Sequence, residues 1–486
     1  MEMPEKHPNF AGQENEQPRF EDLNPKNLPL APIYKLPPEI LLEIFTTSCD
    51  RNMLTRERFC PSLALSAVCR TWRGFMLSAP DLWSSIELIY CSSERPQNMD
   101  SYDFRRIIFR RIYLFMSRSK TTPLDLSIYI AGCSVPGVRS IWRLLAESSE
   151  RWQNLRLAAP REVLLMDDLL EEVAGRLASL KYLALSEEED DIFTPLSSAP
   201  IQFFKTCPSL DTIVLENLNP DNLVLPYHQI KSLTLQDSTV GENLWSLFPT
   251  LEEIVIRDSW YPFHPAQEHT SLSEVRKLEI ISWKTDPGDN FFTPFRALTL
   301  PQLSSLHISY LNVMELDDDS RKSFDEKALT SFLTRSRCSI TELVLTSAPI
   351  SDVQAIRVLG LMPTLRSLHI EEYPGRPNGV PNNMIITSTF LKAISVTIET
   401  APLAPSLSEL TLVLHPSALG FNCQELVEAL SSRCLRISTA VHGLSSADIG
   451  FIGPEEVNPR VIQQLSGARA EGKFGSGFHM RIRRIR

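Results

Sequence analysis

The chain has 486 residues, 43% of them hydrophobic, and its 48 Lys and Arg against 59 Asp and Glu give a net charge of −11. This length suits two or three ordinary domains, or one small domain followed by a long repeat array. The acidic balance argues against a dedicated nucleic-acid-binding surface, which is normally basic, and is typical of ordinary cytosolic solubility.

Secretion and membrane insertion are not predicted. The first thirty residues are polar and proline-bearing, and they lack the apolar run of a signal peptide. No apolar run reaches the roughly 18 residues that a membrane-spanning helix needs. The nine cysteines are scattered and form no Cys-x-x-Cys pair, which is typical of a reducing compartment. We expect a cytoplasmic or nuclear protein without membrane contact.

Residues 1–30 are rich in Pro, Asn, Gln and Glu, and we interpret them as disordered. Residues 31–90 predict a small helical module that opens with a helix at residues 36–45 (LPPEILLEIF). Its two prolines suit a first helical turn, and the helix dipole favours Glu39 there. The apolar residues form one stripe: Ile40, Leu41, Ile44 and Phe45.

A second, stronger helix of the module is predicted to begin at Pro61 and to end before Pro80, because a residue preceding proline avoids the α region. Residues 46–60 between the two helices are polar and predict a loop with a short helix. Residues 81–88 predict a turn that runs into a strand. The second helix presents one apolar face with helical spacing: Leu65, Val68, Cys69, Trp72 and Met76.

Residues 91–120 are predicted to link the module to the rest of the chain through an amphipathic helix at 103–118. Its basic face is interpreted as solvated, and the alternative is a phosphate- or membrane-binding role. Residues 123–130 then alternate as a strand does. The basic face consists of Arg105, Arg106, Arg110 and Arg111, and the buried stripe of Phe104, Ile107, Ile108, Ile112 and Phe115.

From residue 152 onward, the six-residue template apolar-x-x-apolar-x-apolar recurs. Its copies start 16 to 37 residues apart, as the steps from 391 to 407 and from 303 to 340 show. Such a period indicates a repeat array, in which a unit buries its apolar side only by stacking on its neighbours. The copies begin at Trp152, Leu180, Leu210, Ile230, Leu251, Val275, Leu303, Ile340, Leu365, Leu391 and Leu407.

These patterns together predict an α/β protein, in which a small all-α module precedes an irregular leucine-rich solenoid over residues 121–435. Parallel strands are expected inside the solenoid and helices outside it. A helix at 424–432 is expected to close the array. Residues 436–486 are expected to form an irregular, partly disordered tail that ends in the basic segment RIRRIR.

No catalytic constellation with a mechanism emerges from the sequence. It contains no phosphate-binding Gly-x-x-x-x-Gly-Lys-Ser/Thr loop, no Gly-x-Gly-x-x-Gly, no Gly-x-Ser-x-Gly and no His-Glu-x-x-His. The spacing of His264 and His269 does not predict a metal site. A hidden active site would need Glu279, His307 and His369 to meet, and we expect them not to converge. We predict neither enzyme activity nor a cofactor.

The array offers a binding face instead. In each strand, the residue between the last two apolar positions points away from the core, because strand side chains alternate. The alternative for any one of these residues is an ordinary solvent-facing position. The acidic loop at 187–191 is interpreted as solvated, with contact to a basic partner as the alternative. The target-binding candidates are Val214, Thr234, Val255, Glu279, His307, Val344 and His369, in a row that also includes Ala184, Ser395 and Thr411.

The segments LPPEILLEIF at 36–45 and AVCRTWR at 67–73 resemble the F-box, whose pattern is a Leu-Pro-x-Glu-Ile start and a later Val-Cys-Arg-x-Trp-Arg helix. The continuation APDLWSSI at 79–86 and the leucine-rich array are similar to the F-box proteins common in basidiomycete fungi. The resemblance covers about 50 residues for the module and about 290 for the array, where it is specific only to the repeat class.

This resemblance implies a non-enzymatic substrate-recognition subunit of a Skp–cullin–F-box ubiquitin ligase, a monomer within a hetero-complex. The module would bind a Skp-type adaptor and through it a cullin, while the array would hold an unidentified protein target. The alternatives are a non-ligase interaction scaffold with a degenerate F-box and, for single residues, a place in the module's own core. The adaptor contacts carried over are Leu36, Pro37, Ile40, Leu41, Phe45, Val68, Cys69 and Trp72.

Overall fold

The protein is described by a computed structural model. The residues that the structure describes are 33, 36–55, 60–91, 101–131, 135–164, 171–188, 200–238, 241, 244–259, 269–282, 291–310, 324–372, 384–397, 402–414, 423–434, 443–452, 459–471, 474 and 478–485. Predictions for residues 1–30, for His264, and for most of the acidic loop at 187–191 therefore lie outside the described residues.

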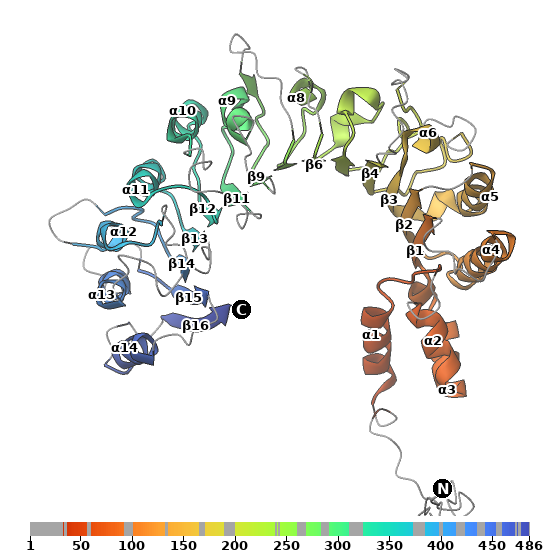
Figure 1. Ribbon diagram of the computed structural model, residues 1–486, viewed down its shortest axis with the longest axis horizontal. Coiled ribbons are helices and arrows are strands. Elements are labelled where there is room, and N and C mark those ends of the chain that lie inside the picture. Colours follow the sequence, from red (N-terminus) through yellow and green to blue (C-terminus); the bar gives the residue numbers. More distant parts are fainter. Residues whose placement is uncertain are drawn as a thin grey trace, which may run out of the picture.

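One parallel sheet of 14 strands runs through the described chain, and each strand pairs with its neighbours in sequence order. Figure 1 shows the strands lining the inside of an arch and the helices lying outside it. The α/β solenoid with inner parallel strands is thus confirmed. The strands of the sheet are β1 (Ser85–Cys91), β2 (Leu124–Ala131), β3 (Trp152–Pro160), β4 (Tyr182–Glu188), β5 (Thr212–Glu216), β6 (Ser232–Gln236), β7 (Glu253–Arg257), β9 (Lys277–Ser282), β11 (Ser305–Tyr310), β12 (Glu342–Thr346), β13 (Ser367–Glu371), β14 (Glu409–Leu414), β15 (Ser446–Ile452) and β16 (His479–Ile485).

The returns between strands contain helices of varied length and a minor sheet formed by β8 (Thr270–Ser271) and β10 (Leu298–Thr299). Short 3₁₀ turns occur at η4 (Pro80–Trp83), η6 (Ser149–Arg151), η7 (Pro220–Asn222) and η8 (Tyr227–Gln229). The outer helices are α4 (Ser101–Arg118), α5 (Val135–Ala146), α6 (Arg161–Leu164), α8 (Leu244–Leu247), α9 (Thr293–Ala297), α10 (Glu326–Ser336), α11 (Asp352–Gly360), α12 (Ser388–Ile394), α13 (Cys423–Cys434) and α14 (Pro459–Ala470).

The core lies between the sheet and the outer helices. The first apolar residue of all eleven template copies is at most 2% exposed. Strands such as β5 and β12 alternate between buried and half-buried residues, so that one side faces this core and the other faces the inside of the arch. Stacking in register buries the repeated leucines in one continuous cluster, which no single repeat could do alone.

Several strands are followed directly by a residue whose backbone has the left-handed conformation. Asn217, Asp237 and Asp258 follow β5, β6 and β7 directly, with φ of 54°, 46° and 45°. Asn and Asp tolerate this region better than other non-glycine residues. The N–H of Asp237 donates to the carbonyl of Arg257 at 2.9 Å, which extends the ladder by one residue before the chain turns outward.

The predicted domain boundaries were wrong at both ends of the array. Strand β1, which was assigned to the module at 31–90, pairs in register with β2. The linking helix at 91–120 is α4, an outer helix like those that follow it. Residues 436–486 were predicted to be an irregular tail, but β15 pairs with β14 and β16 pairs with β15. The solenoid therefore runs from residue 85 to residue 485.

The template copy at 391–396 was also misread as a strand. Residues Ser388–Ile394 form the helix α12, capped by the Thr387 hydroxyl, which accepts from the N–H of Phe390 at 3.3 Å. Apolar residues three apart lie on one face of a helix as readily as they fit the strand template. Ser395 consequently lies after a helix and does not belong to the strand row.

Three helices, α1 (Pro38–Ser48), α2 (Pro61–Val68) and α3 (Arg70–Ser78), form the helical module. Figure 1 shows them projecting from the β1 end of the arch. The second helix was predicted to be continuous, but it breaks at Cys69, whose backbone is extended (φ −156°, ψ 172°) and whose sulfur accepts from the N–H of Trp72 at 3.4 Å.

The segment between α1 and α2 ties the module to the sheet. Met53 bridges to Glu87 at the free edge of β1, and the N–H of Leu54 donates to the carbonyl of Glu87 at 2.9 Å. Asn52 is fully buried, and its Nδ2 donates to the carbonyls of Cys49 and Ser85, 3.2 and 3.1 Å away. Its Oδ1 accepts from the N–H of Ser62 at 3.0 Å. This one side chain joins α1, α2 and β1.

Candidate functional site

Helix α1 has two apolar faces with different surroundings. Leu41 and Phe45 are 5% and 1% exposed, and the Phe45 ring meets the Trp72 ring edge-on, with centroids 4.8 Å apart. Ile40 and Ile44, one position earlier in each turn, are 43% and 41% exposed. The single stripe expected from the sequence is therefore split into an inner and an outer half.

The eight predicted adaptor contacts divide accordingly. Pro37, Ile40 and Val68 are exposed and available to a partner, Val68 with 55% of its surface. Leu41 and Phe45 belong to the module's core, so their assignment as contacts is corrected. Leu36, Cys69 and Trp72 are half-buried.

Three further apolar residues of the module lie in solvent without having been predicted as contacts. They are Leu42, Ile44 and Leu77, each between 41% and 44% exposed. Their helical spacing from the buried residues was the available signal: a residue one position away from a core residue turns about 100° from it. Together with Pro37, Ile40 and Val68 they are the exposed apolar residues of the module, which we call its outer apolar face. Ile40 and Ile44 share one side of α1, whereas Leu42 is turned about 200° from Ile40.

The module is also fixed to α4 through Trp83. The Trp83 indole N–H donates to the carbonyl of Met76 at 2.7 Å, and its ring meets Phe115 edge-on at 5.0 Å. The Arg118 guanidinium lies over the same ring, 4.2 Å from its centroid. Burial, the main cause, and the charge of Arg73 lower the pKa of Arg118. These contacts hold the outer apolar face in a defined orientation to the arch.

The second surface is the concave side of the sheet. The predicted residues of the strands pair in register there, from Val214 to Thr234, Val255, Glu279, His307, Val344 and His369 in turn. The pairing also includes Ala184 before them and Thr411 after them. The expected alignment of the row is thus confirmed, except for Ser395. Thr234 and Val255 are buried and offer little surface to a partner.

Glu279, His307 and His369 were expected not to converge, and the strand registers separate His369 from the other two, although Glu279 and His307 are neighbours. His307 Nδ1 lies 4.0 Å from a Glu279 oxygen, and its Nε2 lies 3.5 Å from Glu342. Because Val344 separates their strands, His369 is about 10 Å from His307, two strand spacings away. The three side chains therefore do not meet at one point of the concave face.

These charges belong to a central network formed by Glu253, Lys277, Glu279, Ser305, His307 and Glu342, in which one lysine faces three carboxylates. Lys277 Nζ lies 2.6 Å from Glu253 and 3.4 Å from Glu279. Partial burial lowers the pKa of Lys277, but the two glutamates outweigh this and raise it. The Ser305 hydroxyl, 2.7 Å away, is the main cause that lowers the pKa of Glu342, with His307 contributing.

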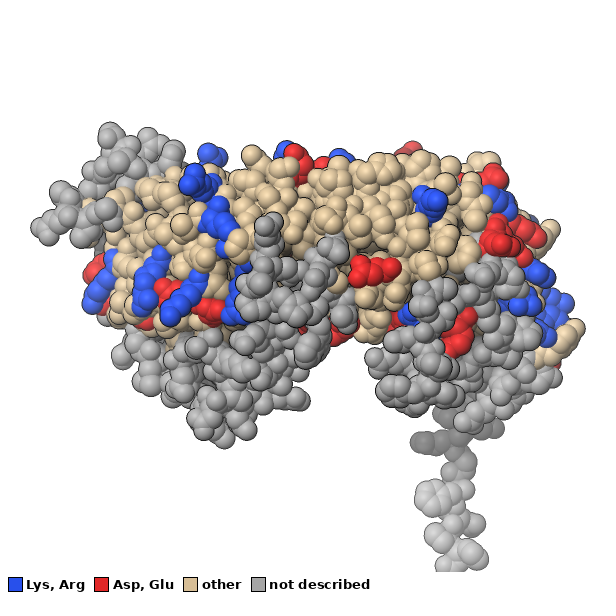
Figure 2. Space-filling model, turned by 90° about the horizontal axis from the view of Figure 1, so that it is seen from above, with Lys and Arg blue, Asp and Glu red and all other residues tan. Residues whose placement is uncertain are grey.

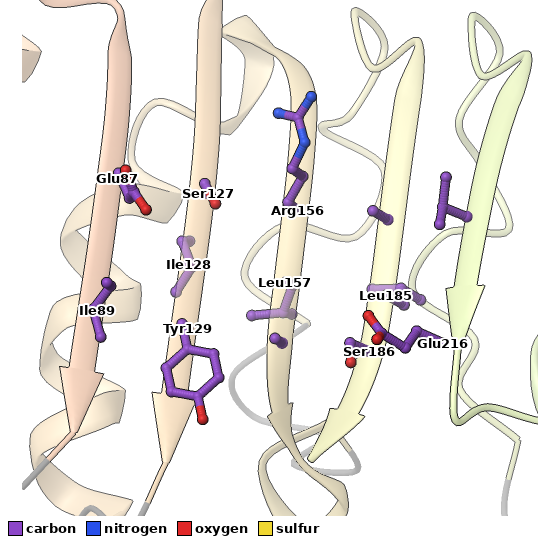
Figure 3. Close-up of a pocket in the computed structure, with 13 residues that line it drawn as sticks. Glu87, Ile89, Ser127, Ile128, Tyr129, Arg156, Leu157, Leu185, Ser186 and Glu216 are labelled. Atoms are coloured by element: carbon purple, nitrogen blue, oxygen red, sulfur yellow. The ribbon is translucent and has the colours of Figure 1, made fainter. Parts of the chain in front are cut away.

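A hollow of about 340 Å³ lies in the concave face between β1 and β5. Figure 3 shows its side chains rising from adjacent parallel strands, with Arg156 at one end and Glu216 beside Ser186 at the other. Its centre is low because β3 and β4 carry small residues there. The lining consists of Glu87, Ile89, Ser127, Ile128, Tyr129, Arg156, Leu157, Ala158, Ala184, Leu185, Ser186, Val214 and Glu216.

The outer surface of the arch is less distinctive. Figure 2 shows Lys and Arg toward both ends of the visible face, with Asp and Glu among them, while its centre is mostly uncharged. Among the described residues, no group of three or more His, Cys, Asp or Glu is arranged to hold a metal ion. No described helix is both long and apolar enough to cross a lipid bilayer.

The two surfaces described above, the outer apolar face of the module and the concave face of the sheet, remain the best candidates for binding.

A scan against protein-family models gives no match for this chain, and a search of curated proteins gives none either. The function is therefore inferred from the geometry and chemistry of the two surfaces.

Proposed function

We propose that the chain is the substrate-recognition subunit of a Skp–cullin–F-box ubiquitin ligase. The module at residues 36–78 binds a Skp-type adaptor and through it a cullin, and the concave face of the sheet binds a protein target. The chain itself performs no chemistry in this role. Its task is to hold one protein at a fixed place relative to another.

The observation that carries the proposal is the outer apolar face of the module. Ile40 and Ile44 on one side of α1, and Val68 at the end of α2, expose 41% to 55% of their surface. Exposed apolar groups that gather on a small module are typical of a protein-binding site. The module that carries them contains the F-box-like segments at 36–45 and 67–73.

The attachment of the module supports the same role. A subunit that presents a target must keep a fixed orientation between its two binding surfaces. Asn52 joins the module to the edge of β1, and Trp83 joins it to α4. Arg111 of α4 adds a bond to the carbonyl of Leu54 at 2.7 Å.

The experiment is a binding measurement between the full chain and a purified Skp-type adaptor. Ile40→Asp with Val68→Asp should weaken the affinity at least about tenfold, because apolar residues central to an interface each contribute on the order of 1–2 kcal/mol. The matched control is Val353→Asp with Leu361→Asp. Val353 lies in α11 and Leu361 directly follows it, and the two residues are similarly exposed, at 46% and 45%.

The control variant should bind as the wild type does. Absence of adaptor binding by the folded wild-type chain at micromolar concentration would rule the proposal out. Equal losses in the two double variants would show that the outer apolar face is not the interface.

The second candidate is a non-ligase interaction scaffold with a degenerate F-box. The helix break at Cys69 and the burial of Leu41 and Phe45 favour it, because they leave only part of the implied contact set in solvent. This candidate predicts target binding without adaptor binding. A reconstituted ubiquitylation assay with adaptor, cullin and the chain separates the two, since only the first supports transfer to a captured target.

A further inference from the structure

The hollow between β1 and β5 owes its depth to small side chains. Ala158 on β3 and Ala184 and Ser186 on β4 line its middle, between Tyr129 on β2 and Glu216 on β5. Its volume of about 340 Å³ lies at the lower end of the range of ligand pockets. It is large enough for one long side chain of a bound peptide together with its flanking backbone.

One end of the hollow carries negative charge that has only neutral partners. Ser186 pairs with Glu216 in register, and both line the hollow. Glu188 follows Ser186 by two residues on the same face of β4, just beyond the lining. The Tyr129 hydroxyl donates to Glu188 at 3.2 Å, and the Gln236 amide donates to Glu216 at 2.7 Å. Both carboxylates are half-buried. Within the described residues, neither forms an ion pair.

The cation that lines the hollow is already engaged elsewhere. Arg156 pairs with Asp125 at 2.9 Å, and its guanidinium lies 4.8 Å from the centroid of the Tyr182 ring. Figure 3 shows it extending away from the end that holds Ser186 and Glu216. Arg156 therefore does not neutralise the two carboxylates.

The walls beside these carboxylates are apolar. Ala184 and Val214 pair in register, next to the register pair Ser186 and Glu216. Lys and Arg are the side chains that combine an apolar stem with a cationic head. Such a side chain would lay its stem on Ala184 and Val214 and form charge-assisted hydrogen bonds at its head.

We propose that this hollow is a subsite for a Lys or Arg side chain of an extended segment of the target protein. The head lies between Glu188 and Glu216, and the Ser186 hydroxyl accepts a further hydrogen bond. The inference deepens the proposed function, because it names the chemistry of the target on the concave face. In the central network, by contrast, Lys277 already pairs with Glu253 and Glu279.

The test selects a phage-displayed library of random 12-residue peptides on the purified full chain, with no adaptor present. Sequencing should show Lys or Arg enriched at one position. The enrichment should be lost on the variant Glu188→Gln with Glu216→Gln and kept on Glu371→Gln with Glu409→Gln. The control carboxylates are Glu371 on β13 and Glu409 on β14 of the same sheet, outside the hollow.

A synthetic copy of a selected peptide gives the magnitude. Its affinity should fall about fivefold in the Glu188/Glu216 variant, as expected for one lost ion pair near a protein surface. Recovery of no peptides, peptides without a cationic preference, or the same preference on the Glu188/Glu216 variant would each overturn the inference. Because the assay omits the adaptor, failure of the proposed adaptor docking would leave this result unchanged, and the converse also holds.

Discussion

The module and the concave face of the sheet differ in the kind of side chain that they expose. The module leaves Ile40, Ile44 and Val68 between 41% and 55% exposed, without cover from the elements that the structure describes. The centre of the sheet covers its apolar residues and exposes charges that pair with one another, such as Lys277 with Glu253. The apolar residues of the module would be covered only by a partner, whereas the charged residues at the centre of the sheet already have partners within the chain.

The difference follows from size. A three-helix module of about 40 residues has too little interior to bury every apolar side chain that its helices need. The array stacks 14 strands, so that each repeat covers the apolar side of its neighbour and the other side of each strand faces the inside of the arch. Tight binding through apolar contacts is therefore expected at the module, and selection by charge and shape at the sheet.

The largest expected effect tests whether α1 has one buried and one exposed apolar face, by truncating one residue on each. Phe45→Ala should destabilise the module by about 3–5 kcal/mol, since it removes a buried ring that packs on Trp72. Ile44→Ala, one residue away, should change stability by less than about 0.5 kcal/mol, because its side chain lies in solvent. Hydrogen exchange of peptides from residues 38–78 measures both.

Exchange in the strands from β5 to β14 serves as the internal control and should stay at the wild-type level in both variants. If Ile44→Ala opened the module as far as Phe45→Ala, the outer apolar face would belong to the core. The division on which adaptor docking depends would then be lost.

A second, smaller effect concerns the joint between the two regions. Asn52→Ala should cost about 2 kcal/mol, because it leaves the N–H of Ser62 and the carbonyls of Cys49 and Ser85 without their buried partner. Faster proteolysis between α1 and α2 would report the loosened joint. Asn154→Ala on β3, a half-buried asparagine of the sheet, is the control and should be close to neutral. Equal proteolysis of both variants would contradict the role of Asn52.

Burial in the array was predictable because a repeated pattern constrains it. All eleven leading apolar residues are buried, and the side of each strand followed from alternation alone. Two strands outside the predicted array carry the same signal. The strand predicted at the end of the module, β1, fits the template with Trp83, Ile86 and Leu88. The missed strand β15 fits it with Leu444, Ala447 and Ile449, with Ala in place of a larger residue.

Other features depend on contacts that no local pattern encodes. Asn52 is a single amide in a polar segment, and its partners lie as far as 33 residues away at Ser85. Arg433 is 1% exposed, and its guanidinium donates to the carbonyls of Ile394 and Ala404. This burial lowers the pKa of Arg433 to about 10. The hollow likewise arises from small residues on β3 and β4, which become neighbours only when the sheet forms.

The smallest predicted effect tests whether neighbouring residues of the central network stabilise the charged form of Glu342. The pKa of Glu342 is lowered in the folded state, mainly by the Ser305 hydroxyl and further by His307. The folded state therefore binds this proton less readily than the unfolded state does. Stability from Glu342 is fully present above the unfolded pKa of about 4.3 and is lost as the pH falls through the lower folded value.

Glu342→Gln removes this titration, so the free energy of unfolding should fall less between pH 5 and pH 3 than in the wild type. The difference should be a few tenths of a kcal/mol, because the side chain is 46% exposed and solvent screens its interactions. Urea unfolding at each pH measures it, with Glu409→Gln on β14 as the control. Identical pH profiles for wild type and Glu342→Gln would mean that the network does not hold this carboxylate, and the sheet's centre would then be as open to a cationic partner as the hollow beside it.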